Sequence, residues 1–415
     1  MAKGITHIVM LEMTQANVFN GVTRCIHTLA NALSRNKQVK VTWLRIVYGA
    51  GYQEPLCHKP VSFLTYRLPN ALGTFLTDAS ERTACWDEIS NSLSPQIQGD
   101  TTVIYHVHTL NLIELATFLK ERVLGKIVTH LHCIPWKTLY DRNYQKYHTL
   151  YKRYYVLKDF YPINDYVYGH YEWLAYQKSD AIICVTQSGH DFLRTIGIQK
   201  DKIHIVYNGL ADISDHNACT QLIHHRQPQV LLFVGNANPS KGLDFLLGAL
   251  SNFKEGTVKL IIIGNFAFQK REQLLSAYPL IDTQFTGQLS LDEMAFYYST
   301  ADIGIIPSIH EQCSYTAIEM MMFGLPVVCT DVDGLRELFQ QGVNALKVPL
   351  LTPSHGRQKV DSDAISEAIH TILRQPSLRE QLSNGARKAY LKHFTEEQMI
   401  QSIEQIYSQL KNLQK

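Results

Sequence analysis

Short runs of Val, Ile and Leu alternate along this chain with segments whose apolar residues recur every three or four positions. The continuous apolar runs are typical of strands buried on both faces of a parallel sheet. The segment Val22–Leu33, with Val22, Ile26 and Leu29 on one side, is typical of a helix that covers such a sheet. The alternation predicts an α/β fold with doubly wound parallel sheets. Strands are expected at Ile5–Leu11, Val39–Val47, Thr101–His108, Gly125–His132, Ala181–Thr186, Val230–Val234, Val258–Gly264, Ala301–Ile306 and Val327–Cys329.

A polar run, Asp212–Gln229, separates two of these alternating regions. With 415 residues, the chain is long enough for two hydrophobic cores. We therefore expect a first domain at 1–210, a linker at 211–229 and a second domain that begins at 230.

Composition sets limits on partners and location. The net charge of +2 gives no indication of a nucleic-acid partner. The eight cysteines contain no C-x-x-C pair, which predicts reduced thiols in a cytoplasmic protein. The N-terminal apolar run is interrupted at Glu12 and is too short for a signal peptide, and no apolar run reaches the ~20 residues of a membrane span. We expect a cytoplasmic protein whose membrane contact, where it has one, is peripheral at the inner face.

The stretch 306–337 predicts a strand, a loop, a helix and a second strand in close succession. The helix is expected to begin at Ser314 or Tyr315 and to end at Gly324, since Pro326 follows. Such a unit places the helix N-terminus at the end of a buried strand, where the backbone can bind an anion.

Two carboxylates in this unit have a spacing that suits a nucleotide sugar. The helix N-terminus offers N–H groups and the positive end of its dipole to a diphosphate. Glu311, in the loop, is placed to accept hydrogen bonds from sugar hydroxyls, and Glu319, more than a turn into the helix, from a ribose diol. Taken alone, two glutamates at this spacing favour a simpler interpretation, two solvated acids at a helix end, and only the surrounding segment reverses that preference.

The whole segment resembles the E-x7-E signature of the retaining family-4 glycosyltransferases. The resemblance includes the upstream Pro307-Ser308, the run Gly324–Val328 and the run Gly334–Glu337. It implies the GT-B architecture, in which two Rossmann-like domains face each other across a cleft. The second domain, 230–394, would bind the donor, and the C-terminal helix, 395–415, would cross back to the first domain.

The resemblance also implies a function. The chain would move a sugar, with retained anomeric configuration, from a nucleotide-diphosphate donor, expected to be UDP-linked, to an acceptor hydroxyl. The acceptor stays open between a glycan, a lipid-linked glycan and a peptide. Two other functions remain as alternatives for this chain. One is that of a nucleotide-sugar epimerase of related fold, and the other is that of a donor-binding homologue without turnover.

Donor-binding residues are implied where this chain matches the family's motifs. Lys241, in the loop Asn236–Gly242, is expected to contact the diphosphate, with Ser240 as the N-cap of the next helix. The backbone of the segment Gln284–Leu289 is expected to contact the nucleobase. The full expected set is Gly235, Asn236, Lys241, Gln288, Leu289, Glu311, Ser314, Tyr315, Thr316 and Glu319.

Two positions depart from the family's pattern. Asn236 stands where the family commonly has an arginine, and loss of that charge-assisted contact costs about 1.5–3 kcal/mol of donor binding unless another residue compensates. Asn20-Gly21 stands in place of a Gly-Gly pair in the N-terminal loop. Because asparagine tolerates positive φ, the same turn is expected at Asn20.

The implied catalysis is electrostatic. Lys241 and the helix N-terminus at Ser314–Thr316 would stabilise charge on the leaving diphosphate while the sugar becomes oxocarbenium-like. Glu311 would hold the sugar, and His132, at the end of a predicted strand, would face it from the first domain. The expected catalytic residues are thus His132, Glu311 and Lys241, with no metal ion and no cofactor.

Two predicted strands end in the pattern H-x-H, at His106–His108 and at His130–His132. Alternate residues of a strand share a face, so two neighbouring strands could cluster four imidazoles. This pattern supports a rival hypothesis, a metal-dependent hydrolase with histidine ligands. For His106 and His130 the simpler interpretation is a hydrogen-bonded core histidine.

The segment 139–176 holds half of the chain's 22 tyrosines, interleaved with Lys and Arg. The spacing of Tyr140, Tyr144, Tyr147, Tyr151 and Tyr154 predicts a helix. One interpretation is a packed amphipathic helix, and the other is a helix that binds the acceptor or a membrane surface.

Overall fold

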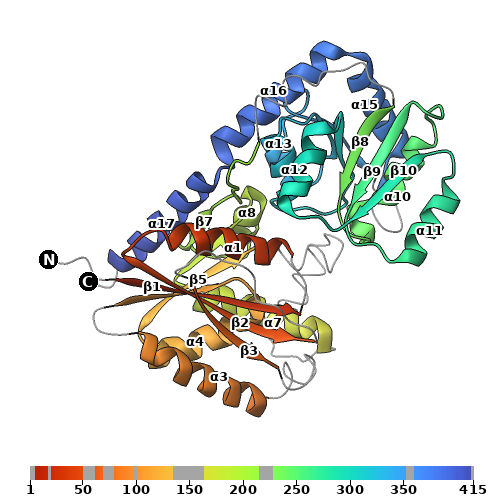
Figure 1. Cartoon of the computed structure of the whole chain (residues 1–415). Coiled ribbons are helices and arrows are strands. Elements are labelled where there is room, and N and C mark those ends of the chain that lie inside the picture. Colours follow the sequence, from red (N-terminus) through yellow and green to blue (C-terminus); the bar gives the residue numbers. More distant parts are fainter. Residues whose placement is uncertain are drawn as a thin grey trace. The chain divides into compact units, whose positions relative to one another are not determined.

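The computed structural model describes residues 5–16, 20–49, 61–68, 79–97, 101–133, 163–214, 228–351 and 359–412. The chain forms two compact units (Figure 1). Unit 1 comprises Met1–Val206 with Met399–Lys415, and unit 2 comprises Tyr207–Gln398. Most of the last helix, α17 (Glu396–Asn412), therefore belongs to the first unit, which confirms the expected return of the C-terminus.

Unit 1 is built on a parallel sheet. Within the described ranges, seven strands pair in the order β3-β2-β1-β4-β5-β6-β7, and each neighbouring pair is parallel. The strands are β1 (Thr6–Gln15), β2 (Val39–Tyr48), β3 (Val61–Arg67), β4 (Thr102–Val107), β5 (Gly125–Leu131), β6 (Ala181–Cys184) and β7 (Ile203–Ile205). Among the described residues, the α-helices besides α17 are α1 (Gly21–Leu33), α3 (Ala79–Leu93), α4 (Ile113–Arg122), α7 (Ile163–Lys178) and α8 (Gln187–Thr195).

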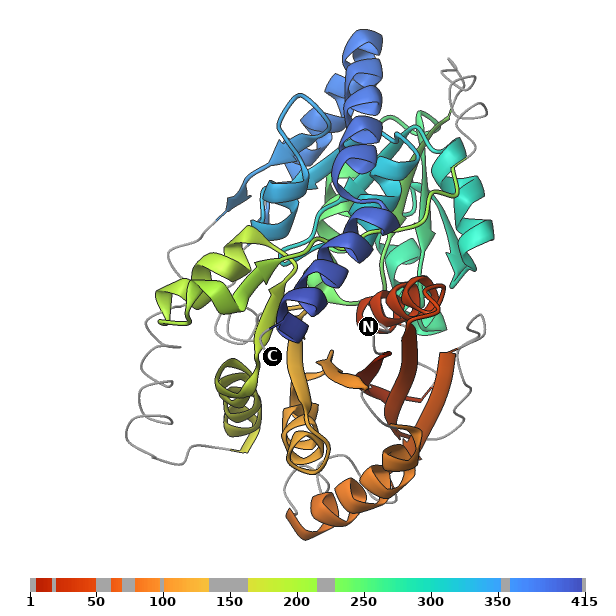
Figure 2. The ribbon, with the colours of Figure 1, turned by 90° about the vertical axis from the view of Figure 1, so that its left-hand side faces the viewer.

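Helices cover both faces of this sheet (Figures 1 and 2). In both views α1 and α17 lie on one face, and α3 and α4 lie on the other. Alternate residues of β4 face opposite sides, so Tyr105 and Val107 pack into the core beneath α4 while His106 points toward Tyr407 of α17. The α1 side of the sheet thus carries buried polar groups as well as apolar ones.

Unit 2 repeats the design with a shorter sheet. In the described part of the chain, its main sheet has the order β10-β9-β8-β11-β12-β13, again parallel throughout. Its strands are β8 (Gln229–Val234), β9 (Val258–Ile263), β10 (Asp282–Gly287), β11 (Ile303–Ile306), β12 (Val327–Thr330) and β13 (Leu346–Val348). Two short strands, β14 (Leu350–Leu351) and β15 (Lys359–Val360), form a separate antiparallel pair. The α-helices described in this unit are α10 (Leu243–Leu250), α11 (Phe268–Ala277), α12 (Leu291–Thr300), α13 (Tyr315–Met322), α14 (Asp333–Leu338), α15 (Ser362–Arg374) and α16 (Pro376–His393).

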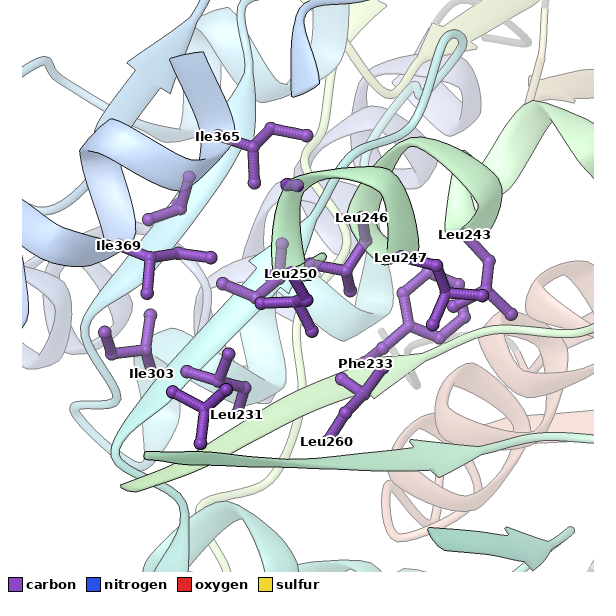
Figure 3. Packing of buried hydrophobic residues seen from close by; sticks show 14 of the residues in the cluster. Leu231, Phe233, Leu243, Leu246, Leu247, Leu250, Leu260, Ile303, Ile365 and Ile369 are labelled. Atoms are coloured by element: carbon purple, nitrogen blue, oxygen red, sulfur yellow. The ribbon is translucent and has the colours of Figure 1, made fainter. Parts of the chain in front are cut away.

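One hydrophobic core of unit 2 lies between the sheet and the helices α10 and α15 (Figure 3). Leu246 and Leu250 of α10 meet Leu231 of β8 and Ile369 of α15 in one buried cluster. Each such leucine contributes about 1.5–3 kcal/mol through the apolar surface that it removes from water. This packing fixes the start of α10, and with it the loop that precedes the helix.

The predicted strands are all present, and β1 continues past Leu11 to Gln15. The sequence did not predict β3, an edge strand whose side chains are only half-buried. The predicted tyrosine helix at 140–154 lies outside the described residues. Of the helices described, none combines the length and the hydrophobicity that crossing a membrane requires.

Candidate active site

Two loops of unit 2 meet at the carboxyl edge of its sheet. Strand order reverses between β8 and β11. In open α/β sheets, ligands bind beside the loops that follow the strands at such a reversal. The N–H of Ile309 donates to the carbonyl of Ser240 at 2.8 Å. Gly242 has φ +74°, and a Cβ there would come within 1.9 Å of the Pro307 carbonyl oxygen. Only glycine therefore allows this close approach of the two loops.

An ion pair joins the same two loops. Lys241 Nζ lies 2.6 Å from Glu311 Oε1, although the two residues are 70 positions apart in the sequence. The Ser308 hydroxyl donates to the same carboxylate oxygen at 2.9 Å. The Glu311 side chain is only 10% exposed, whereas that of Lys241 is 34% exposed. The carboxylate is therefore fixed, and the ammonium remains accessible to a second anion.

The helix α13 begins directly after this loop. Ser314 is its N-cap, with the hydroxyl accepting from the Ala317 N–H, so the predicted start of the helix is confirmed. Tyr315 and Thr316, in the first turn, are half-buried. The positive end of the helix dipole thus follows the ion pair closely in the chain, and both favour a bound anion.

Glu319 lies one turn further along α13 and is 2% exposed. Its Oε2 accepts a hydrogen bond of 2.6 Å from the hydroxyl of Tyr298 on α12. Neither Glu311 nor Glu319 is a solvated acid at a helix end, so that simpler interpretation of the pair is wrong. Both carboxylates are held in place, which is what a binding site for hydroxyl groups needs.

The remaining predicted donor residues lie along the same edge. The N–H of Gly235 donates to Ile263 at the end of β9, and exposed Gln288 and half-buried Leu289 follow the edge strand β10. Asn236 accepts from the Asn265 N–H through Oδ1 at 3.1 Å. Asn236 therefore holds the loop that follows β9, which gives this position a structural role beside the expected one.

One local prediction in this region is wrong. Ser240 does not cap the next helix, because it lies inside a short 3₁₀ turn, Pro239–Lys241. Asn238 caps that turn through the Ser240 N–H, and α10 begins at Leu243 after Gly242 without a side-chain cap. The positive φ required at Gly242 ends the turn and prevents one continuous helix.

In unit 1, the corresponding reversal of strand order lies between β1 and β4. Asn20 has φ −118° and is the N-cap of α1, with Oδ1 accepting from the N–H groups of Val22 and Thr23. The expected turn with positive φ at Asn20 is therefore wrong. Asparagine replaces glycine here because its side chain satisfies the free N–H groups of the helix.

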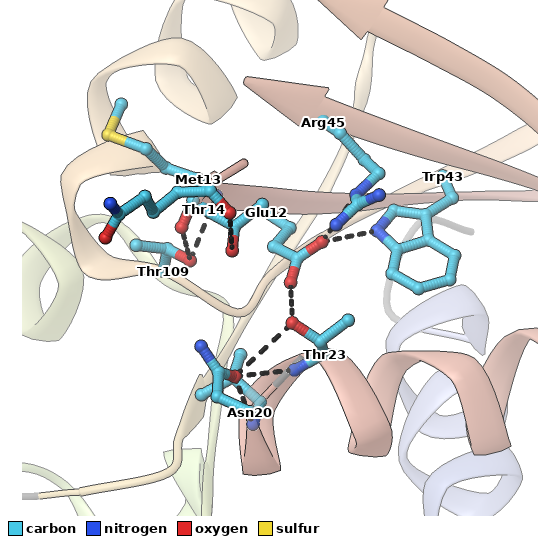
Figure 4. Close-up of polar contacts among 10 residues, drawn as sticks. Glu12, Met13, Thr14, Asn20, Thr23, Trp43, Arg45 and Thr109 are labelled. Atoms are coloured by element: carbon cyan, nitrogen blue, oxygen red, sulfur yellow. Dashed lines mark hydrogen bonds and ion pairs between the residues drawn. The ribbon is translucent and has the colours of Figure 1, made fainter. Parts of the chain in front are cut away.

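A buried carboxylate anchors this end of α1 (Figure 4). Glu12 is 1% exposed and accepts from Thr23 Oγ1 at 2.6 Å, Trp43 Nε1 at 3.1 Å and Arg45 Nε at 2.8 Å. The three donors come from α1 and β2, and Glu12 itself comes from β1. Sequence analysis missed this network, although an acidic residue inside a buried strand was a signal for it.

The four histidines of the two H-x-H patterns do cluster. Strands β4 and β5 are neighbours, and His108 Nδ1 lies 3.0 Å from His132 Nε2. The rings of His130 and His132 stack with centroids 4.3 Å apart. Tyr407 on α17 lies 2.7 Å from His106 Nδ1, which confirms His106 as a hydrogen-bonded core histidine.

Burial keeps these imidazoles neutral. It lowers the pKa of His106 and of His132 to about 3, and the neighbouring His132 adds to the effect on His106. The pKa values of His108 and His130 are lowered well below the usual 6.5 by burial and then by the other histidines. His130 has no hydrogen-bond partner for either ring nitrogen among the described residues, so its prediction as a hydrogen-bonded residue is wrong.

Two family profiles together match most of the chain. Residues 19–212 match the family described as Glycosyltransferase Family 4, and residues 220–389 match the one described as Glycosyl transferases group 1. The chain belongs to the family-4 glycosyltransferases.

One relative of this family-4 member is an uncharacterized glycosyltransferase of Methanocaldococcus jannaschii, 27% identical over 52% of this chain. The match spans 57% of that protein, little more than half of its length. Sucrose-phosphate synthase from Thermosynechococcus elongatus superposes with a TM-score of 0.76 at 18% identity, over 98% of this chain and 100% of that one. Anabaena HepE, solved with UDP-glucose, superposes with a TM-score of 0.70 at 17% identity, over 97% and 100%. These similarities establish the GT-B fold of two Rossmann-like domains.

Proposed function

We propose that this protein is a retaining hexosyltransferase that moves a sugar from a UDP-linked donor to an acceptor hydroxyl. The observation that carries the proposal is the ion pair of Lys241 and Glu311, held by Ser308 at the point where strand order reverses. A fixed carboxylate and an accessible ammonium, followed by a helix N-terminus, form a site for a sugar attached to a diphosphate.

In the proposed reaction, the diphosphate takes the place of Glu311 as the partner of Lys241. The ammonium and the first turn of α13 then stabilise the charge that builds on the leaving group. Glu311, released from the ion pair, accepts hydrogen bonds from the sugar, and Glu319 accepts them from the ribose. In this proposal, His132 of unit 1 faces the donor sugar. These groups meet the phosphate charge without a metal ion in the reaction.

The donor assignment has two supports. HepE binds UDP-glucose and shares the fold. In this chain, β10, which precedes Gln288 and Leu289, lies three strand positions from β11, which precedes Glu311, about 14 Å at the usual strand spacing. That separation supports a base at Gln288 and Leu289 with the phosphates at the Lys241–Glu311 pair. For the acceptor we propose a glycan, a lipid-linked glycan or a peptide, with any membrane contact peripheral.

Thermal denaturation with UDP, GDP or ADP tests the proposal. A ligand at 100 times its dissociation constant adds about 2.7 kcal/mol, so UDP is expected to raise the melting temperature by a few degrees. Each nucleotide is compared with a nucleotide-free sample at the same chelator concentration, and the UDP shift is expected to be equal with and without chelator. A shift that requires a divalent ion, or no shift with any of the three, would contradict the proposed site.

Asn236→Arg restores the cation that the family commonly has at this position. We expect it to tighten UDP binding by roughly tenfold, because a charge-assisted contact contributes about 1.5–3 kcal/mol and the variant loses the hydrogen bond to Asn265. Isothermal titration with UDP measures the change. Asn236→Gln is the matched control, since it adds length without charge. Equal affinities for all three proteins would show that position 236 does not face the phosphates.

Asn236 also favours a second candidate, a donor-binding protein without turnover, because asparagine in place of the family's usual arginine leaves the diphosphate with one cation fewer. Such a protein would bind UDP in the same titration. It would release neither UDP by hydrolysis nor a glycosylated product with simple sugar acceptors. Retained configuration in a product, read by proton NMR of the anomeric centre, would support the transferase.

A further inference from the structure

The histidine cluster of unit 1 also has a thiol as a neighbour. Cys25 on α1 lies against His108, His130 and His132, and one ligand atom from each of the four residues lies within 4.8 Å of the others. His108 and His132 directly follow β4 and β5, which are hydrogen-bonded neighbours. Two strands and the helix that covers them thus bring three imidazoles and a thiol to one place.

The cluster contains buried nitrogens that the surrounding protein does not satisfy. Both ring nitrogens of His130 and Nε2 of His108 have no hydrogen-bond partner among the residues that the structure describes. His130 is 1% exposed and His108 is 4% exposed, so bulk water does not reach them either. Unsatisfied buried polar groups are rare and need an explanation. A cation bound to one nitrogen of each ring would explain the unsatisfied lone pairs.

We propose that Cys25, His108, His130 and His132 form a binding site for one divalent transition-metal ion, with Zn²⁺ as the best match. Three imidazole nitrogens and one thiolate are a ligand set that Zn²⁺ prefers, and four protein ligands make a closed site. Bond lengths of about 2.0–2.3 Å place tetrahedral ligand atoms about 3.3–3.8 Å apart. Ligand atoms already within 4.8 Å need to move by only about an ångström. Binding releases the Cys25 thiol proton to solvent, and the neutral imidazoles have no proton to lose.

The site departs from the expectation of no bound metal. It does not rest on the proposed transferase reaction, although His132 belongs to both. The ion would tie β4 and β5 to α1 and hold the ring of His132, because a metal ligand keeps a fixed orientation. An imidazole that binds the ion through one ring nitrogen can still donate a hydrogen bond through the other. The ion contributes to the structure of unit 1, and no step of the proposed reaction uses it.

Metal content tests the proposal on the full chain without an affinity tag. After dialysis against Zn²⁺ and removal of the excess, we expect elemental analysis to find one more Zn²⁺ per chain in the wild type than in His130→Gln. Competition with a chromophoric chelator is expected to show Zn²⁺ affinity at least ~100-fold lower in His130→Gln and Cys25→Ser, beyond the 10–100-fold that loss of an outer partner costs. Wild-type protein with Co²⁺ should show a thiolate charge-transfer band that Cys25→Ser lacks.

Matched controls separate the site from nonspecific binding. His7→Gln and Cys85→Ser alter a buried histidine and a buried cysteine of the same unit outside the cluster, and both should retain wild-type Zn²⁺ content. Because the wild-type measurements need no variant, a folding defect in a variant does not decide the result. The proposal is overturned if the wild type binds no Zn²⁺ tightly, or if His130→Gln binds as much as His7→Gln. UDP binding, measured separately, tests the transferase proposal.

Discussion

Replacement of Glu12 by alanine is expected to lower the free energy of unfolding of unit 1 by about 3–5 kcal/mol, because the buried partner Arg45 would lose its carboxylate. In the same variant, the indole N–H of Trp43 would lose its acceptor. The Thr23 hydroxyl would lose its 2.6 Å hydrogen bond to Glu12 and keep the 3.3 Å one to Asn20. A loss of this size is a large part of the 5–15 kcal/mol that stabilises a typical domain.

Tryptophan fluorescence during urea unfolding measures this loss selectively. The four tryptophans, at 43, 86, 136 and 173, all lie within Met1–Val206, so their signal reports unit 1. Glu114→Ala is the matched control, since its ion pair with Arg82 is partly exposed and is expected to contribute no more than about 1 kcal/mol. The pair Glu12→Leu with Arg45→Met should recover much of the stability, because no buried charge remains. A loss below about 1 kcal/mol for Glu12→Ala would show that the network does not stabilise the unit.

Replacement of Lys241 by alanine is expected to reduce the transfer rate by about 100–1000-fold, the range observed when one preorganised group that stabilises transition-state charge is removed. The ammonium is the accessible half of the ion pair with Glu311, and the proposed reaction places it on the leaving diphosphate. Stability should change little, because the Lys241 side chain is a third exposed and Glu311 keeps its bond from Ser308.

Steady-state transfer from UDP-glucose, followed as UDP release with an acceptor present, measures the rate. Lys254→Ala removes an exposed lysine of the same unit and should leave the rate unchanged. Glu311→Gln provides a contrast. It should reduce the rate while UDP alone still binds, because it loses sugar contacts and leaves Lys241 free for the phosphates. Wild-type rates in Lys241→Ala and Glu311→Gln together would refute the assigned site.

The proposed donor site of unit 2 was predictable to an unusual degree because several of its residues are close together in the sequence. Glu311, Ser314 and Glu319 lie on one strand-loop-helix segment, so their spacing and the capping preference of serine place them near one another. Lys241 was assigned to the phosphates through the family resemblance, but its ion pair with Glu311 links positions 70 residues apart. Asn20 shows the opposite case. Asparagine is compatible both with a turn of positive φ and with an extended N-cap, and the N-cap forms because its side chain accepts from the first N–H groups of α1.

The sequence by itself determined the alternation of buried strands and amphipathic helices, the two Rossmann-like domains and the family, because periodicity and contiguous motifs are properties of neighbouring residues. Tertiary structure alone decided which distant side chains meet. It paired Glu12 with Arg45, placed half-buried β3 at a sheet edge, and brought Cys25 against three histidines at the carboxyl ends of β4 and β5. Strand order and register determine such contacts, and these depend on packing across the whole sheet.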